Sequence, residues 1–158
     1  MKILLILTLL SMSAFAKVPR QRIKMLGAES HKQDNLVKVD YFLKLKTEKF
    51  DFFDPYQAHK KVKVDAVKLE DLFLYFAPKA KSVKFKAINL YKVHILREVE
   101  RSKSTYLMFK QDGQWLKNAQ LGPMRVIRRG LGKVSKKDIT LEGADWIWMI
   151  TEMQFIYE

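Results

Sequence analysis

The sequence contains no cysteine, and this absence excludes several kinds of protein chemistry. A fold without cysteine has no disulfide framework, so its stability depends on the burial of apolar side chains. Thiolate nucleophiles and thiolate metal ligands are excluded as well. Histidine is scarce, and His31, His59 and His94 stand far apart with no second type of ligand at metal-binding spacing. The residues alone therefore give little support to an enzyme or a metal centre.

Long apolar runs are also scarce, and the clearest one lies at the N-terminus. Residues 3–10 are almost entirely apolar, Lys2 precedes them, and residues 14–16 have the small-x-small pattern of a cleavage site. This arrangement is typical of a secretory signal peptide and is short for a membrane span. We expect a signal peptide at residues 1–16, a periplasmic or secreted protein, and no transmembrane segment after cleavage. A retained N-terminal anchor is the alternative.

Acidic residues are outnumbered, with 17 Asp and Glu against 30 Lys and Arg, which gives a formal net charge of +13. Such an excess attracts polyanions, although export argues against nucleic acid as the natural partner. The lysines alternate with apolar residues in segments such as "KKVKVDAVK" and "KSVKFKA". A solvated, lysine-rich sheet face explains this pattern most simply. A dedicated anion-binding surface is the alternative.

The periodicity predicts one α+β domain at residues 35–158, with a mixed β-sheet, more strand than helix, and a flexible basic segment at residues 17–34. Alternation in "VKVDYFLKLK" predicts a strand from Leu36, followed by an aromatic loop at residues 50–56 that turns at Asp54-Pro55. We expect the aromatic residues of this loop to lie in the core.

Later in the chain the signals are stronger. Four residues at helical spacing predict an amphipathic helix that Pro78 ends, and Asp112-Gly113 predicts a hairpin. The last run, "DWIWMITEMQFIYE", is apolar on both faces. It is therefore predicted to be a central strand that is covered on both sides. The four residues of the helix are Leu69, Leu72, Phe73 and Phe76.

The stretch "QLGPMRVIRRGLGK" combines a Gly-Pro turn, a short apolar strand and three arginines. Guanidinium groups bind phosphate or carboxylate through two parallel hydrogen bonds, and glycines allow backbone amides to approach such a group. The residues by themselves favour the alternative of a tight turn, a packed strand and solvated arginines, since arginine clusters are common on basic surfaces. The candidate anion site consists of Gly122, Pro123, Arg125, Arg128 and Arg129.

The segment "YLMFKQDGQWLKNAQLGPMRVIRR", followed by "WIWMITEMQF", resembles the molybdopterin-binding domain of the sulfite-oxidase-like oxidoreductases. It is most similar to the small exported single-domain members. Upstream, "VKLEDLFLYFAPKAKSVKFKAINLYKVHI" is similar to the Leu-rich helix and following strands of that family. The resemblance covers roughly residues 60–156. It implies a strand-rich molybdopterin-binding fold whose cofactor groove is bordered by the candidate anion site.

The sequence departs from that family at positions that matter for catalysis. Catalytic members bind molybdenum through a cysteine, which is missing here. Asn89-Leu90-Tyr91 replaces the usual Asp-Gly-Tyr, Arg129 replaces a proline, and Ile147 replaces a lysine. We therefore expect no cofactor, and molybdopterin is implied by the resemblance only.

These observations favour a non-catalytic protein of the cell envelope that binds a small anionic ligand or an acidic envelope protein. One alternative is a pterin-dependent oxidoreductase or its accessory subunit. The other is a basic electrostatic adaptor for envelope polyanions.

Overall fold

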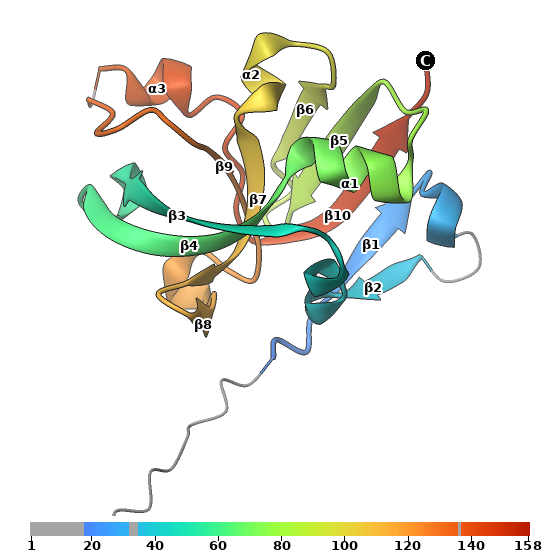
Figure 1. The fold of residues 1–158 in the computed structure, drawn as a ribbon, viewed down its shortest axis with the longest axis horizontal. Coiled ribbons are helices and arrows are strands. Elements are labelled where there is room, and N and C mark those ends of the chain that lie inside the picture. The colour runs from blue at the N-terminus through green and yellow to red at the C-terminus, as the bar shows by residue number, and fades with distance from the viewer. Residues whose placement is uncertain (1–17, 32–34, 136) are drawn as a thin grey trace, which may run out of the picture.

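The computed structural model describes residues 18–31, 35–135 and 137–158. The predicted signal peptide lies outside these residues. Two five-stranded sheets form the fold, one mixed and one antiparallel, with few and short helices (Figure 1). This arrangement confirms the predicted strand-rich α+β fold class. No helix in the described part of the chain is long and apolar enough to cross a membrane.

The first sheet has the strand order β2-β1-β10-β5-β6. Among the described strands of this sheet, only β1 and β10 pair in parallel, and the other pairs are antiparallel. One face of the sheet packs on the main core, against α1 (Leu69–Phe76), which lies in front of β10 in Figure 1. The strands are β1 (Arg22–Leu26), β2 (Leu36–Lys38), β5 (Ser82–Ala87), β6 (Lys92–Leu96) and β10 (Ile150–Ile156).

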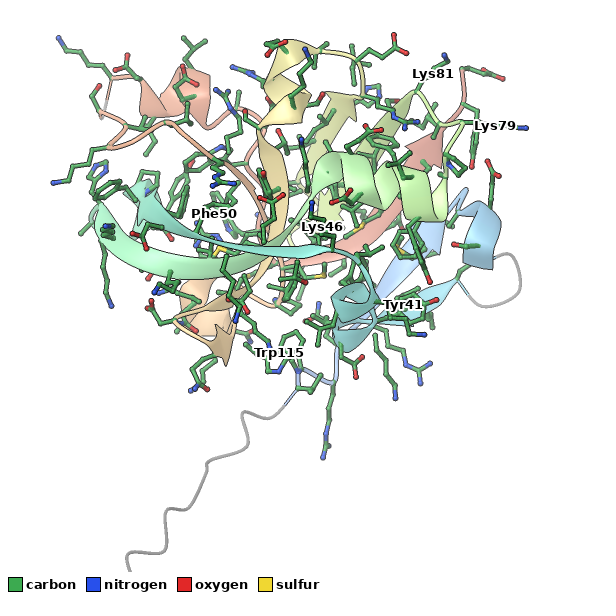
Figure 2. All side chains as sticks on the ribbon, in the orientation of Figure 1. Tyr41, Lys46, Phe50, Lys79, Lys81 and Trp115 are labelled. Atoms are coloured by element: carbon green, nitrogen blue, oxygen red, sulfur yellow. The ribbon has the colours of Figure 1, made fainter. Side chains whose placement is uncertain are left out.

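The second sheet has the order β3-β4-β7-β8, and β9 pairs with the other part of β7. It contributes to the main core and also forms a second core cluster. Phe50 of β3 (Figure 2) belongs to that cluster, with its ring centre 5.0 Å from that of Tyr106. The strands are β3 (Thr47–Asp54), β4 (Lys60–Lys68), β7 (Thr105–Gln111), β8 (Gln114–Trp115) and β9 (Arg125–Arg128).

Short helices connect the strands. The predicted amphipathic helix is confirmed as α1, in which the four residues of the predicted apolar face are all buried and which ends before Pro78. The predicted hairpin is also confirmed, because Asp112 and Gly113 join β7 to β8 with φ of +50° and +76°. The other helices are α2 (Glu100–Lys103), α3 (Ile139–Glu142), η1 (Glu29–His31), η2 (Val39–Lys44), η3 (Pro55–Gln57) and η4 (Asn118–Gln120), the η elements being 3₁₀ helices.

The prediction of a flexible segment at residues 17–34 is wrong for Arg22–Leu26, which forms β1 and pairs with β10. Ile23 and Met25 are fully buried in the main core. Two apolar residues are too few to give a clear period-two signal, so the sequence pattern missed this strand. The domain therefore begins before residue 35.

The predicted strand from Leu36 is also wrong beyond Lys38, because Val39–Lys44 is a 3₁₀ helix. Val39, Phe42 and Leu45 are buried at a spacing of three, which is the period of that helix. The predicted aromatic loop is instead the end of β3, where Phe50 and Phe52 alternate inward. The prediction that the aromatic residues of this segment lie in the core is confirmed for Phe50 and Phe52, whereas Tyr56 is exposed.

The last strand is central, as predicted, because β10 lies between β1 and β5. It is not covered on both sides, since Gln154 is exposed on the face away from the core. The pairing with β5 shifts between Ile150 and Glu152. Trp146 and Trp148, two of the four apolar residues that suggested a second buried face, precede the strand, and Trp146 belongs to the second core cluster instead.

Candidate functional site

The five predicted site residues lie at the turn before β9, along β9 and just after it. The Gly122-Pro123 peptide bond is cis, and both residues are buried. All four residues of β9 are buried, which includes Arg125 and Arg128. Arg129 lies beyond the strand and is exposed. The three arginines therefore share a strand region but differ in their surroundings.

Gly122 is required by close packing. A Cβ atom at this position would lie 2.4 Å from the carbonyl oxygen of Leu116 and 2.6 Å from its carbonyl carbon. These are backbone atoms, so a larger side chain would force the turn and the end of β8 apart. The sequence pattern of Gly followed by Pro correctly indicated a constrained turn.

We expect Gly122→Ala to lower the free energy of unfolding by about 1–3 kcal/mol, as overpacking does in other proteins. Gly132→Asn is the control, because Gly132 has φ of +62°, which Asn tolerates, and a Cβ there meets nothing within 4 Å. Urea unfolding should separate the two variants. Equal stability of Gly122→Ala and the wild type would contradict the close packing.

Arg125 is held by a buried carboxylate. Its Nη1 lies 2.5 Å from Asp54 Oδ2 and its Nη2 lies 3.1 Å from Asp54 Oδ1. The side chains of Arg125 and Asp54 are 1% and 0% exposed. Asp54 also accepts hydrogen bonds from the backbone N–H of Tyr56 and from Gln57. Because Asp54 compensates its charge, Arg125 anchors the end of β3 to β9.

Arg129 is paired on the outer side of the second sheet. Its Nη1 lies 2.8 Å from Glu48 Oε2, and its guanidinium carbon lies 4.7 Å from the ring centre of Phe50. The hydroxyl of Tyr106 donates to the same Glu48 oxygen. Hydrogen bonding with Tyr106 is the main cause of the raised pKa of Arg129; burial partly opposes it, and Glu48 adds a smaller increase. Arg129 is therefore part of an ion pair at the protein surface.

Arg128 is buried but only partly compensated. Its Nη2 donates to Glu142 Oε2 of α3 at 2.7 Å, and its side chain is 10% exposed. Its Nε and Nη1 are buried and have no hydrogen-bond partner in the protein. The indole Nε1 of Trp146, a residue that is 2% exposed, also has no partner. A buried donor without a partner costs about 1–3 kcal/mol.

These two side chains line a cavity of about 140 Å³, which we call the Arg128 cavity. A Cβ atom at Gly130 or Gly132 would meet nothing within 4 Å, and both glycines have positive φ. Arg128 and Trp146, which carry three of the four unpaired buried nitrogens in the described residues, are among the lining residues, whereas His59, which carries the fourth, is not. The lining residues are Asp51, Phe52, Phe53, Arg128, Gly130, Leu131, Gly132 and Trp146.

Asp51 is the acidic residue in this lining, and it is already paired. Its Oδ2 lies 2.8 Å from Lys61 Nζ, and the hydrogen bond with Lys61 lowers the pKa of Asp51. The Asp51 carboxylate is half exposed. Its charge is therefore balanced by Lys61 and screened by solvent, which leaves Arg128 as the lining residue whose charge is only partly compensated.

A second cavity, of about 220 Å³, lies beyond an aromatic wall. The ring of Tyr56 packs between the indoles of Trp146 and Trp148, at centroid distances of 5.7 Å and 4.8 Å. Burial is the main cause of the raised pKa of Tyr56, and Arg125 partly opposes it. The residues that line this second cavity are Ala87, Asn89, Tyr91, Ile147 and Trp148.

This second cavity brings together positions at which the sequence was compared with the family: Tyr91 and Trp148 match its pattern, whereas Asn89 and Ile147 depart from it. Asn89 and Tyr91 follow β5, whereas Ile147 and Trp148 precede β10. Arg125 forms an isolated backbone bridge with Trp148. The segments after β5, at the start of β9 and before β10 therefore meet at one place. None of the three arginine side chains lines this cavity.

Sequence reasoning missed the acids that hold the arginines and the tryptophan beside Arg128. Asp54 enters the sequence analysis only as the start of a turn, Trp146 only as part of the last strand, and Glu142 does not enter it at all. No local signal links Asp54 to Arg125, which is 71 positions away. Only the pairing of β3, β4, β7 and β9 brings these residues together.

Comparison with known proteins supports the fold. No protein-family model matches the sequence, and no curated protein matches it. Among solved structures, the sulfane dehydrogenase SoxCD from Paracoccus pantotrophus matches with a TM-score of 0.57 and 13% sequence identity. The alignment covers 87% of this chain and 38% of that chain. At this identity the match shows a shared fold, and it agrees with the predicted sulfite-oxidase-like class.

The residues present do not fit molybdenum bound through a thiolate, because the chain has no cysteine. The described residues contain no group of three or more His, Cys, Asp or Glu that could hold a metal ion. The two cavities beside the predicted site, about 220 and 140 Å³, are smaller than the roughly 300–1,000 Å³ of typical cofactor sites, and a cavity of about 310 Å³ lies elsewhere, between α1 and Arg97. Binding of a pterin at the five predicted site residues stays a prediction.

Proposed function

We propose that this protein is a non-catalytic binding module of the cell envelope, which takes a small oxyanion in the Arg128 cavity. The observation that carries the proposal is the set of three buried donors, on Arg128 and Trp146, without partners in the protein. An oxyanion supplies acceptors to all of them, and its charge balances the guanidinium that Glu142 compensates only at one nitrogen. Export to the periplasm or beyond is part of this proposal.

The size of the cavity limits the ligand. A volume of about 140 Å³ corresponds to roughly four or five water molecules at about 30 Å³ each. Inorganic phosphate, sulfate or a short carboxylate fits this space. The adjacent aromatic wall of Tyr56 and Trp148 would contact any apolar extension of the ligand.

Titration calorimetry with inorganic phosphate, sulfate and acetate, at constant ionic strength, tests the proposal. We expect saturable binding of one anion per chain, in about the micromolar to millimolar range, together with a change in tryptophan fluorescence. Trp146→Phe removes one donor while it keeps an aromatic ring, and should weaken binding by about threefold to tenfold.

Arg129→Gln is the matched control, because Arg129 is the neighbouring arginine but pairs with Glu48 outside the cavity. It should bind anions as well as the wild type does. Absence of saturable heat with all three anions would overturn the proposal. So would a loss in Arg129→Gln as large as the loss in Trp146→Phe, since binding would then follow surface charge alone.

The second candidate function is a pterin-dependent oxidoreductase or its accessory subunit, and the fold shared with sulfane dehydrogenase favours it. Because this chain spans about 38% of the length of that chain, the activity of the longer protein belongs to this chain only as a proposal. Metal analysis of protein purified from its native host separates the two functions. Stoichiometric molybdenum would support the oxidoreductase.

A further inference from the structure

The hairpin between β5 and β6 presents apolar side chains to solvent. Ile88, Leu90 and Tyr91 are 64%, 69% and 50% exposed, and Leu90 is the most exposed large apolar residue in the described part of the chain. Asn89 completes this four-residue segment, which we call the tip. Exposed apolar side chains are normal one at a time, whereas three in a single turn indicate a contact surface.

The tip is ordered by its own hydrogen bonds. The backbone N–H of Ala87 donates to Tyr91 O, that of Leu90 donates to Ala87 O, and that of Ile88 donates to Met149 O, all at 2.9–3.0 Å. Leu90 has φ of +69°, a conformation that is unfavourable for a leucine. The fold therefore holds Leu90 outward in a strained conformation, and such strain concentrates at binding sites.

Lysines surround the base of the tip. Lys84 and Lys86 on β5 face His94 and Lys92 on β6, and Lys86 lies directly opposite Lys92. Like charges that face each other across two strands are destabilising. An external negative charge at this place would relieve the repulsion.

The basic surface continues across the outer face of the first sheet. The residues of β5, β6, β10 and β1 that point away from the core form rows, one of which runs from Lys92 and Lys86 to Glu152 and Lys24. Glu152, 3.8 Å from Lys24, is the acidic residue in this part of the described sheet. We call the set Arg22, Lys24, Lys38, Lys84, Lys86 and Lys92 the lysine face.

We propose that the tip and the lysine face bind an anionic lipid bilayer, with the tip inserted between the headgroups. A bilayer surface offers negative phosphates next to an apolar interior, so it matches both features of the hairpin. An acidic protein or polysaccharide would match the lysines but would leave three apolar side chains in contact with polar groups. This proposal does not depend on the Arg128 cavity.

Sedimentation with vesicles tests the proposal, with phosphatidylcholine alone and with added phosphatidylglycerol. We expect the full-length mature protein to bind the vesicles that contain phosphatidylglycerol, more tightly at low salt than at high salt. Ile88→Ser/Leu90→Asn should weaken this binding at least about tenfold. Asn tolerates the left-handed conformation at position 90, so this variant should remain folded with an unchanged or higher melting temperature.

Two pairs of variants make the test specific. Leu74→Ser/Leu141→Ser removes two exposed apolar side chains elsewhere, 56% and 67% exposed, and should bind like the wild type. Lys84→Glu/Lys92→Glu should weaken binding by about thirtyfold or more, from about 1 kcal/mol per lysine near the surface. Lys46→Glu/Lys79→Glu changes the net charge equally beside α1 (Figure 2) and should have a smaller effect.

The proposal is overturned if the wild type ignores phosphatidylglycerol vesicles, or if the tip variant binds them as well as the wild type does. An equal loss in the two lysine variants would also overturn it, because binding would then follow net charge alone. If the wild type forms a dimer and does not bind vesicles, and Ile88→Ser/Leu90→Asn is a monomer, the tip mediates contact between two copies of this chain instead.

Discussion

Asp54→Ala is expected to destabilise this protein more than any other single change considered above, by about 3–5 kcal/mol. Asp54 and Arg125 are both essentially inaccessible to solvent, and their two hydrogen bonds are the parallel pair of a bidentate interaction. Removal of the carboxylate leaves the guanidinium charged and buried. It also removes the acceptor for the backbone N–H of Tyr56, so the turn after β3 loses its anchor.

Chemical denaturation of Asp54→Ala, measured beside the wild type, gives the loss directly. Asp54→Leu/Arg125→Met is the informative companion, because replacement of both charges by apolar groups avoids the unpaired ion and should recover much of the loss. Asp51→Ala is the matched control, since Asp51 is half exposed on the same strand and pairs with Lys61 at the surface. A loss below about 1 kcal/mol in Asp54→Ala would contradict a buried, structural ion pair.

Arg128→Met is expected to separate stability from binding. In the absence of an anion, this change removes two buried donors that have no partner, and the freed Glu142 is 30% exposed and can be solvated. We therefore expect an unchanged or higher free energy of unfolding, because an unpaired buried polar group is replaced by an apolar one. A functional residue that costs stability in the free protein is a common feature of binding sites.

With phosphate at about one hundred times its dissociation constant, the wild type should gain about 2.7 kcal/mol and Arg128→Met should gain nothing. Thermal unfolding at several phosphate concentrations measures both effects. Arg101→Met is the control, because Arg101 is half-buried and pairs with Asp145, and neither residue lines the cavity. Equal stabilisation of Arg128→Met and the wild type by phosphate would show that the anion binds elsewhere.

The parts of the fold that could be predicted are those with a local physical cause. The helix at Leu69–Phe76 follows from apolar residues on one face and a proline beyond its end. The hairpin at Asp112-Gly113 follows from two residues that tolerate positive φ. The class of the fold also followed, because the same alternating strands recur along most of the chain.

The errors occurred where a tertiary contact overrode a local pattern. Val39–Lys44 alternates like a strand, yet it is a 3₁₀ helix. This conformation buries Val39, Phe42 and Leu45, which are spaced three residues apart, in the main core. Arg22–Leu26 has little pattern of its own and becomes a strand because the edge of β10 provides its partner.

For the candidate site, the sequence determined the chemistry that is available. The absence of cysteine excluded thiolate ligands, and the run from Gly122 to Arg129 supplied a constrained turn and three guanidinium groups. Only the tertiary structure decided what each group does, because the acid that pairs with a guanidinium determines whether its N–H donors are free to bind a ligand. Asp54 occupies Arg125, Glu48 holds Arg129 at the surface, and Arg128 alone of the three keeps two buried donors unpaired. Those acids lie far from the arginines in sequence, and the strand pairing that brings them together has no local signature.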